Sequence, residues 1–369
     1  MPPLSFLIKP ASSACNLRCK YCFYHSIAEN RTVANTGCLS LVLLEKLIRE
    51  AFDNAQGSCT FAFQGGEPTL VGLNYYRELI KLQDKYKRSG IHVNNTIQTN
   101  GMLIDDEWAS FLKENNFLVG LSLDGPAAVH DANRVHSSGK GSFNRVMKTV
   151  ALFNRYAVEY NILSVITGKN SDNIEKIYNF LKKNRFKHLQ FIVCLEPLGQ
   201  ERGTSVYHLS IKRYETFLCN LFDLYMRDLL AGDYISIRQF DNYVRMANAE
   251  NPEACNMCGR CSIQLIVEGD GGIYPCDFYV YDEYRLGTIG ADSLKDCIGS
   301  KTAQTFIQDS MYIPDDCKVC PHYALCRNGC RRDRTSTGKN YYCEAYKGFF
   351  DKKEKEICSI ALLLQSNML

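Results

Sequence analysis

The sequence predicts an α/β fold, a partial barrel of parallel strands followed by a cysteine-rich C-terminal domain. Between residues 5 and 196, six apolar, strand-like runs alternate with helical segments. Three cysteines spaced C-x3-C-x2-C follow the first of these runs. Ten of the 18 cysteines lie between Cys255 and Cys343, among glycines, prolines and polar turns. These three observations together indicate two differently built domains.

The six predicted strands are rich in Val, Ile, Leu and Phe, and most end at a polar or glycine-containing turn: Ser5–Lys9, Cys59–Gln64, Val93–Gln98, Leu118–Leu123, Asn161–Ile166 and Leu189–Leu195. Helices are expected near residues 40–54, 74–88, 105–116, 142–157 and 172–184, and a longer helical stretch near 208–248. Because each helix carries the chain back to the same end of the sheet, the strands should run parallel. Six units are too few to close a full barrel, so we expect a partial (β/α)6 barrel with reactive groups at the carboxyl ends of the strands.

We place the barrel at residues 1–235 and the cysteine-rich domain, with a C-terminal helix, at residues 236–369.

Lys and Arg exceed Asp and Glu by only 43 to 40, which argues against a nucleic-acid or membrane partner. The amino terminus lacks the basic and apolar regions of a secretory signal, so a cytoplasmic location is expected. In a reducing compartment, clustered cysteines indicate metal ligands or catalytic groups rather than disulfides.

The first cysteine group consists of Cys15, Cys19 and Cys22. A four-iron cluster normally takes one cysteine per iron, so three thiolates leave one iron open to bind and reduce a ligand. A zinc site is the alternative, but it normally needs four ligands, and no fourth Cys or His lies at a matching distance. The spacing, with the aromatic Tyr21 before the third cysteine, resembles the signature loop of the radical S-adenosylmethionine enzymes. This resemblance implies a catalytic cluster.

Two turns at later strand ends extend the resemblance. The segment Gln64-Gly65-Gly66-Glu67-Pro68 resembles the amino-group-binding motif of that family, and Glu67 could accept hydrogen bonds from an ammonium. Ser122 ends the fourth strand and could bind a ribose, and Arg134 in the following loop could pair with a carboxylate. The resemblance implies S-adenosylmethionine contacts from Tyr21, Gly66, Glu67, Ser122, Arg134 and Leu195. Separately, Tyr24 and Gln64 are expected to face the substrate. For Leu195, a plain core position is an almost equal alternative.

The C-terminal cysteines, from Cys261 onward, are similar in order to the seven-cysteine extension of peptide-modifying radical enzymes, the SPASM domain. Two four-iron clusters need eight ligands, and either Cys255 or Cys258 supplies the eighth. Following the interleaved pattern of that family, one auxiliary cluster takes Cys255, Cys261, Cys276 and Cys330, and the other takes Cys317, Cys320, Cys326 and Cys343. The implied cofactors are three [4Fe-4S] clusters and S-adenosylmethionine.

Cys276-Asp277-Phe278-Tyr279, together with Cys22-Phe23-Tyr24, resembles the anaerobic sulfatase-maturating enzymes within the SPASM group. The resemblance implies that a cysteine or serine of an unfolded sulfatase is oxidised to formylglycine after a 5′-deoxyadenosyl radical abstracts hydrogen from Cβ, with an auxiliary cluster accepting an electron. Asp277 is the candidate base, since a carboxylate beside a buried cluster would be partly desolvated; the alternative is a turn aspartate. The implied partners are an extended Cys/Ser-x-Pro/Ala-x-Arg segment of the sulfatase and an electron donor such as flavodoxin or ferredoxin.

Two other functions fit parts of the pattern. A SPASM maturase would form thioether or carbon–carbon crosslinks in a small peptide, but no extra N-terminal peptide-recognition domain is visible in the sequence. An iron–sulfur electron-transfer protein would not need an open iron, and the three-cysteine loop argues against it.

Overall fold

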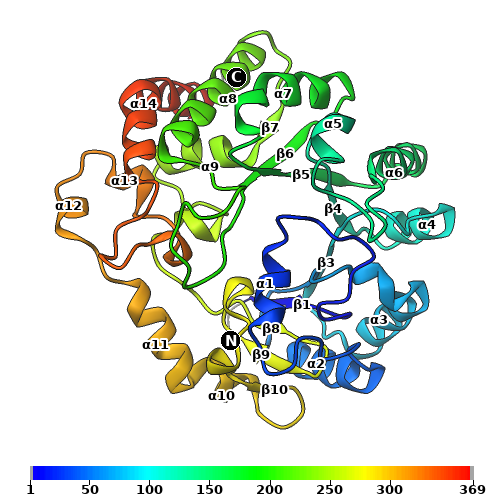
Figure 1. The fold of residues 1–369 in the computed structure, drawn as a ribbon. Coiled ribbons are helices and arrows are strands. Elements are labelled where there is room, and N and C mark those ends of the chain that lie inside the picture. The colour runs from blue at the N-terminus through cyan, green and yellow to red at the C-terminus, as the bar shows by residue number, and fades with distance from the viewer. Residues whose placement is uncertain (1–2, 366–369) are drawn as a thin grey trace. The chain divides into compact units, whose positions relative to one another are not determined.

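The computed structural model describes residues 3–365 (Figure 1). Contacts divide the chain into two compact units. The first unit contains the residues up to 123, then 127–161 and 263–305. The second unit contains residues 124–126, 162–262 and the residues from 306 onward. The predicted domain boundary between residues 235 and 236 follows chain order and stays a prediction.

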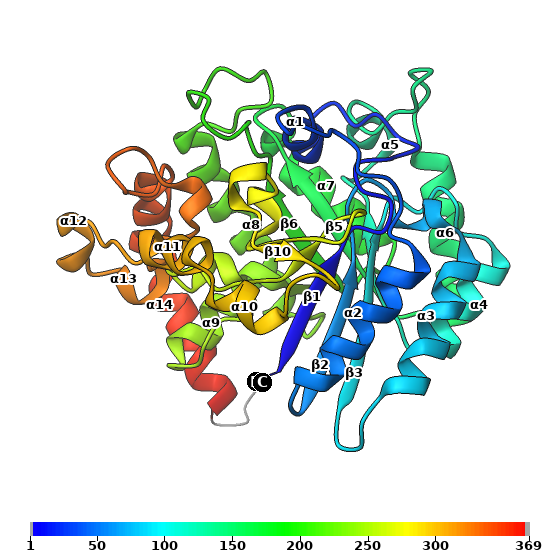
Figure 2. The ribbon, with the colours of Figure 1, turned by 90° about the horizontal axis from the view of Figure 1, so that it is seen from below.

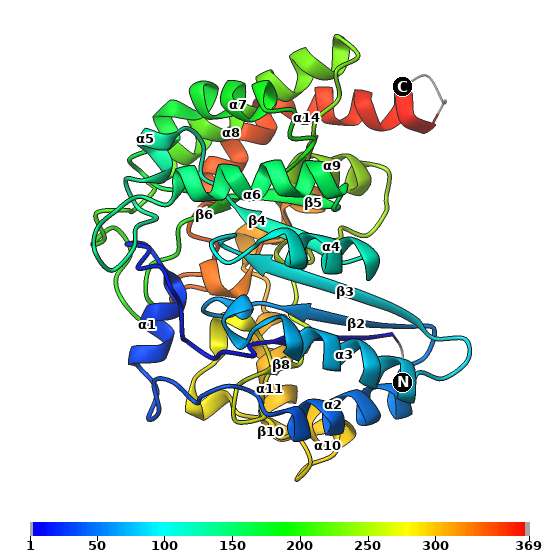
Figure 3. The same cartoon turned by 90° about the vertical axis from the view of Figure 1, so that its right-hand side faces the viewer.

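The first unit is built on four parallel strands in the spatial order β1 (Leu4–Ile8), β2 (Ser58–Phe63), β3 (His92–Thr99) and β4 (Leu118–Ser122). Helices α2 (Leu41–Asn54), α3 (Leu73–Tyr86), α4 (Asp106–Glu114) and α6 (Phe143–Tyr156) lie along them (Figure 3). In α2, Ser40 caps the first turn, and apolar side chains three and four residues apart form the buried face. The short helix α1 (Phe23–Glu29) lies at the carboxyl end of β1 (Figure 2).

Residues 263–305 also belong to the first unit, although they follow far later in the chain. Strand β8 (Ile266–Val267) pairs in parallel with β1, placing Val267 beside Ile8. Strands β9 (Gly272–Tyr274) and β10 (Gly287–Thr288) continue from β8 in antiparallel pairs. The segment around Cys276 is thereby tied to the strand that precedes the first cysteine loop.

The second unit contains parallel strands β5 (Tyr160–Ile166, of which the first two residues belong to the first unit), β6 (His188–Val193) and β7 (Ser236–Ile237). Its long helices are α7 (Ile174–Lys183), α8 (Ile211–Leu230), α9 (Arg238–Ala247) and α14 (Cys343–Gln365), and α14 packs on α8 and α9 (Figure 3). Phe349 in α14 contacts Phe222 and Phe240 at ring-centroid distances of 5.7 and 6.0 Å. These aromatic contacts form much of the core between the helices.

The remaining elements are short helices: α5 (Ala127–His130), α10 (Leu294–Gly299), α11 (Lys301–Ser310), α12 (Asp315–Lys318), α13 (Tyr323–Cys326), and the 3-10 turns Pro68–Val71, Ser171–Asn173, Cys255–Met257, Asp277–Tyr279, Asp282–Tyr284 and Arg331–Asp333. Within residues 3–365, no helix carries an apolar stretch long enough to cross a membrane.

The predicted α/β fold with mostly parallel strands is confirmed. All six predicted strands and the first five predicted helices agree with the structure to within two residues at each end. The stretch near 208–248 was expected to be helical throughout, but it forms α8 and α9 separated by β7. The helix ends because Gly232 adopts a φ of +73°, a left-handed conformation that glycine tolerates.

Candidate active site

The first cysteine loop is held on one side by the Gly65-Gly66-Glu67 turn at the end of β2. The Gly66 amide donates a hydrogen bond to the Ser12 carbonyl at 2.9 Å, and the Glu67 amide donates to the Ala14 carbonyl at 2.8 Å. A Cβ on Gly66 would lie 1.9 Å from the Ala14 oxygen, so this position requires glycine. The turn therefore packs directly against the chain that carries the first cysteine.

On its other side, the loop is held by residues 133–135. Backbone hydrogen bonds join residues 18 and 20 to these residues at 2.7 and 3.0 Å. The Arg134 guanidinium lies 5.6 Å from the centre of the Tyr21 ring, within the range of a cation–π contact. Of the predicted cofactor contacts, Tyr21 thus lies within the cysteine loop, and Gly66 and Arg134 border it.

Within the loop, Cys15 and Cys19 are partly exposed and Cys22 is exposed. The Cys15 sulfur accepts a hydrogen bond from the Leu17 amide at 3.4 Å and one from the Asn100 side chain at 3.8 Å. Burial raises the pKa of the Cys15 thiol to about 12, although the Leu17 amide opposes this. The thiol keeps its proton at neutral pH, so iron must displace that proton when it binds.

Asn100 is a residue that the sequence analysis missed. It follows Thr99 at the carboxyl end of β3, and its side-chain amide also donates to Asn16 at 2.7 Å. No motif marks it. Only its place at a strand end, next to the predicted reactive edge of the sheet, could have drawn attention to it.

Glu67 has a different setting from the one expected. Its carboxylate is 1% exposed and accepts hydrogen bonds from the Thr69 amide and hydroxyl, the Thr99 hydroxyl and the Asn100 amide, at 2.6 to 3.1 Å. Burial raises the pKa of this carboxyl, and the four hydrogen bonds oppose the rise. These protein groups use most of the carboxylate's acceptor positions, so Glu67 joins the ends of β2 and β3, and its contact with an ammonium stays a prediction.

Two further predicted cofactor contacts lie at strand ends. Ser122 is the last residue of β4, and its hydroxyl accepts a hydrogen bond from the Gln98 side chain at 3.1 Å. Leu195 lies in the second unit, just beyond β6, and is partly exposed. Both positions agree with reactive groups at the carboxyl ends of parallel strands, while their cofactor contacts stay predictions.

Asp277, the predicted base, is held by two side chains from strand ends. Its Oδ1 lies 2.5 Å from the Lys9 ammonium, and its Oδ2 accepts a hydrogen bond from the Gln64 amide at 3.0 Å. Asp277 is buried, with 8% of its surface exposed, and Lys9 is fully buried. The structure therefore brings Gln64 and Asp277 together as candidate site residues and adds Lys9, which the sequence analysis did not select.

Tyr24 lies against the same lysine. The Lys9 ammonium is 3.8 Å from the centre of the Tyr24 ring. The Tyr24 hydroxyl donates a hydrogen bond to Glu268, which also pairs with Arg31 at 2.9 Å. Tyr24 is only 3% exposed, so its hydroxyl is occupied within the protein, in contrast to the expectation that it faces the substrate.

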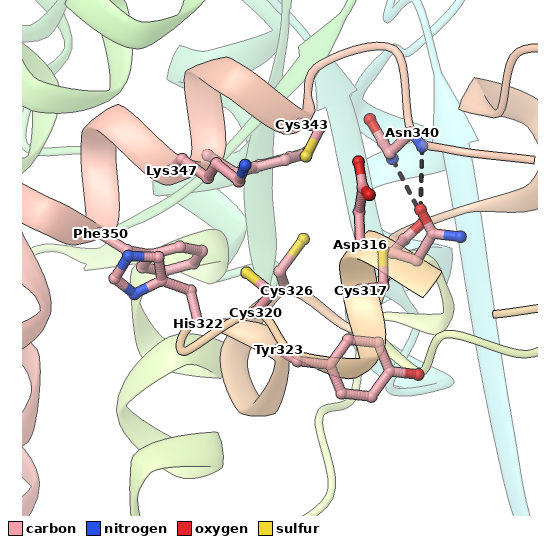
Figure 4. A pocket seen from close by; sticks show the side chains of 12 residues that line it. Asp316, Cys317, Cys320, His322, Tyr323, Cys326, Asn340, Cys343, Lys347 and Phe350 are labelled. Atoms are coloured by element: carbon pink, nitrogen blue, oxygen red, sulfur yellow. Dashed lines mark hydrogen bonds between the residues drawn. The ribbon is translucent and has the colours of Figure 1, made fainter. Parts of the chain in front are cut away.

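Four predicted ligands of an auxiliary cluster, Cys317, Cys320, Cys326 and Cys343, line one cavity in the second unit (Figure 4). Helices α12 and α13 carry two of them, and Cys343 is the first residue of α14. Burial raises the pKa of the Cys326 thiol to about 12. This set of four thiols fits a [4Fe-4S] cluster, which would bind with release of their protons. In the described part of the chain, no three His, Cys, Asp or Glu side chains are grouped closely enough to hold a single metal ion.

The ligands predicted for the other auxiliary cluster are distributed between the units. Cys276 lies in the first unit, and Cys255, Cys261 and Cys330 lie in the second. Cys255 is exposed, whereas the thiol of its alternative, Cys258, points back to the Ala254 carbonyl at 3.8 Å. The Cys330 sulfur accepts a hydrogen bond from the Arg332 amide at 3.4 Å. The assignment of these cysteines to one cluster stays a prediction.

Comparison with known proteins identifies the family. Residues 10–181 match the radical SAM superfamily, and residues 255–321 match the SPASM iron–sulfur cluster-binding domain. A "cysteine-type anaerobic sulfatase-maturating enzyme" of Clostridium novyi is 48% identical over 99% of both chains. This chain belongs to the anaerobic sulfatase-maturating enzymes. It is therefore a radical S-adenosylmethionine oxidoreductase that contains a cluster-binding SPASM domain.

Other members of the anaerobic sulfatase-maturating enzymes support this assignment. A serine-type member from Bacteroides thetaiotaomicron is 32% identical, with 94% of this chain and 89% of that one covered. The structure described as "Native anSMEcpe with bound AdoMet and Kp18Cys peptide" matches with a TM-score of 0.94 and 44% identity, covering 98% of this chain and 99% of that one. The family uses S-adenosylmethionine and iron–sulfur clusters, which agrees with the predicted cofactors.

Proposed function

We propose that this enzyme oxidises a cysteine of an unfolded sulfatase to Cα-formylglycine. The observation that carries the cysteine assignment is the difference in similarity between the two types of relative. Three cysteine-type enzymes are 45% to 48% identical to this chain, whereas three serine-type enzymes are 29% to 32% identical. We therefore assign to this enzyme the cysteine preference of the more similar group.

The proposed cofactor site uses the cysteine loop and the groups around it. Cys15, Cys19 and Cys22 would hold three irons of the first cluster, which leaves the fourth iron for S-adenosylmethionine. The proposed contacts to that cofactor come from Tyr21, Gly66, Ser122, Arg134 and Leu195. When bound, the cluster and S-adenosylmethionine would supply the oxidising equivalent that removes one hydrogen atom from the substrate Cβ. Glu67 would support the site by fixing the Gly66 turn and Asn100.

The proposed role of Asp277 is to accept the proton of the substrate thiol. The cysteine then loses one hydrogen atom, one proton and one electron, which leaves a thioaldehyde. The auxiliary clusters would receive the electron, and water would replace sulfur to give the aldehyde and hydrogen sulfide. Support for Asp277 comes from its burial and from Gln64 and Lys9, which hold its two oxygens. A proton acceptor must be fixed in place, and this one is.

The proposed partners are a peptide and a protein electron donor. The substrate would be an extended Cys-x-Pro/Ala-x-Arg segment, because a side chain within a folded sulfatase could not reach the site. A flavodoxin or ferredoxin would supply the electron that starts each turnover, and the reaction would take place in the cytoplasm.

The test is anaerobic reconstitution with S-adenosylmethionine, a reductant and two peptides that differ only in cysteine or serine at the target position. The cysteine peptide should lose about 18 mass units and the serine peptide about 2, with kcat/KM at least about tenfold higher for cysteine. Trapping with a hydrazide should label the aldehyde, which a thioether or carbon–carbon crosslink would lack. Cofactor cleavage with an unmodified peptide would reject the proposed substrate, and a higher kcat/KM for serine would reject the cysteine preference.

Asp277→Asn tests the proposed base in the same assay. Formylglycine production should fall by about 100-fold or more, while iron content and cofactor cleavage remain, because only proton transfer is removed. Asp270→Asn is the matched control, since Asp270 forms a partly exposed pair with Arg285 at 3.0 Å. Full activity in the Asp277 variant would exclude this residue as the base.

A further inference from the structure

We propose that Lys9 is a positioning residue for peptide oxidation, holding the Asp277 carboxylate in the orientation that accepts the substrate proton. This inference rests on the proposed function. Its basis is the juxtaposition of three segments at the carboxyl ends of β1, β2 and β9, where Lys9 and Gln64 hold opposite oxygens of one buried carboxylate.

Strand register explains why Lys9 lies there. Lys9 immediately follows β1, and its amide donates a hydrogen bond to the Val267 carbonyl at 2.8 Å. Residues 9 and 268 therefore directly follow two neighbouring parallel strands, and both of their charged side chains are fully buried. A lysine is almost never fully buried unless its charge is compensated, so this position demands an acidic partner.

The buried charges divide into two pairs. Lys9 lies against Asp277, and Arg31 lies against Glu268, which gives two positive and two negative groups. Glu268 is further occupied by the Tyr24 hydroxyl. Tyr24 also covers the Lys9 ammonium with its ring at 3.8 Å. Burial raises the pKa of Glu268 and the Lys9 charge opposes this rise, but the carboxylate in direct contact with the Lys9 ammonium is that of Asp277.

The contact between Lys9 and Asp277 is close but does not use up their hydrogen-bonding capacity. The two atoms lie 2.5 Å apart, yet in the described residues neither Lys9 Nζ nor Asp277 Oδ1 completes a hydrogen bond of normal geometry. Buried polar atoms of this kind call for an explanation beyond stability. A substrate group placed beside this pair could complete these bonds, which is the arrangement expected of a prepared site.

Asp277 depends on such support because its own segment is short. It begins a three-residue helical turn after Cys276, and this turn offers no regular helix to fix the side chain. Lys9 restrains one oxygen from β1, and Gln64 restrains the other from the end of β2. Removing Lys9 should leave the carboxylate chemically present but free to turn, and displacement of a reacting group by about 1 Å can cost about 100-fold in rate.

The experiment compares Lys9→Met and Lys9→Arg holoenzymes with the wild type, using the cysteine peptide. The measured quantity is formylglycine formed per cofactor molecule cleaved. In Lys9→Met this ratio should fall by about tenfold or more, with the iron content unchanged, and Lys9→Arg should restore part of it by returning the positive charge. Lys182→Met is the matched control, because it removes a lysine paired with Asp228 at 2.8 Å in the second unit and should keep the wild-type ratio.

A double variant separates positioning from general stabilisation. If Lys9 acts through Asp277, Lys9→Met should cause no further loss of product in an Asp277→Asn background, whereas independent effects would multiply. Thermal unfolding of the wild type, Lys9→Met, Asp277→Asn and the double variant measures the energy of the contact between the two side chains. The destabilisations caused by the two substitutions should not be additive.

The outcomes separate the role of Lys9 from the proposed function of the enzyme. A wild-type ratio in folded Lys9→Met enzyme, or a multiplicative loss in the double variant, overturns the role of Lys9 and leaves the proposed function intact. An unmodified peptide with wild-type enzyme that still cleaves the cofactor overturns the proposed function, and the role of Lys9 with it.

Discussion

The two groups of cysteines that the structure describes most fully differ in how they are enclosed. Cys15, Cys19 and Cys22 lie on an irregular loop that backbone hydrogen bonds hold from both sides, and Cys22 is exposed. The four cysteines of the C-terminal group line a cavity of their own, and one of these residues is buried while three are partly exposed (Figure 4). Two lie on the short helices α12 and α13, and a third begins α14.

This difference indicates that cysteine thiolates hold two kinds of cluster site in this protein. A loop fixed through its backbone can expose the face of a three-cysteine cluster to a small molecule, as a site with one open iron requires. A cavity lined by four thiols satisfies every iron of its cluster and links the segments that supply them. Under the proposed function, the first arrangement would serve reactivity, and the second would serve electron transfer.

The largest effect is expected from Cys19→Ala in the first cysteine loop. The open cluster should be lost, so the enzyme should contain about four fewer irons and cofactor cleavage should fall by about 1,000-fold or more. Iron analysis and chromatography of the cleaved cofactor measure these changes. Cofactor cleavage near the wild-type rate would show that this loop does not hold the catalytic cluster.

Cys326→Ala tests the closed group. The variant should also lose about four irons, yet its cofactor cleavage should stay within about tenfold of wild type while formylglycine falls by about 100-fold, because only electron removal is affected. The contrast with Cys19→Ala is the control. Equal losses of cleavage in both variants would abolish the distinction between a reactive loop and a closed cavity.

Asn100→Ala should have a moderate effect on the loop. The side chain donates to the Cys15 sulfur at 3.8 Å, and removing a group that orients a metal ligand typically costs about tenfold or more in affinity or activity. Cofactor cleavage and the rate of iron release to a chelator are the measurements. Asn95→Ala is the control, since it breaks a reciprocal pair with Gln83 at 2.9 Å and leaves the loop untouched; the same loss there would indicate a general packing effect.

Asp228→Asn should have the smallest effect on activity, because Asp228 stabilises only the second unit. Burial alone would raise its pKa, but hydrogen bonds from Arg227, Lys182 and Tyr178 outweigh this and lower the pKa from 3.8 to about 2. A lowered pKa gives stability that is complete above the unfolded value and is lost as the pH falls towards the folded one. The variant should lose about 2 kcal/mol of unfolding free energy.

Urea unfolding of the anaerobic holoenzyme measures this loss. The difference between the wild type and Asp228→Asn should be constant from about pH 5 to pH 8, because the carboxyl is ionised throughout that range in both states, and it should shrink below about pH 4. Product per cofactor cleaved should not change. A stability difference that varied between pH 5 and pH 8 would contradict the lowered pKa.

The sequence by itself determined the strands, most of the helices and the cysteine groups, because these depend on local patterns. Apolar runs that alternate with helical periodicity identify β1 to β6, and the spacing of Cys15, Cys19 and Cys22 indicates an incompletely ligated cluster. The cysteines at 317, 320, 326 and 343 were assigned together through the resemblance to the SPASM domain, and the structure places them in one cavity. Two-residue strands such as β8 could not be predicted from the sequence because they are too short to show an alternating pattern.

Tertiary structure alone decided which polar groups meet. Lys9 and Asp277 are far apart in the chain and become neighbours because β8 pairs with β1 and brings residues 263–305 into the first unit. The same pairing gives Tyr24 its partner Glu268, while the joining of β2 to β3 turns Glu67 inward. Strand register sets these contacts, and burial then makes charge compensation obligatory, which no local pattern in the sequence can specify.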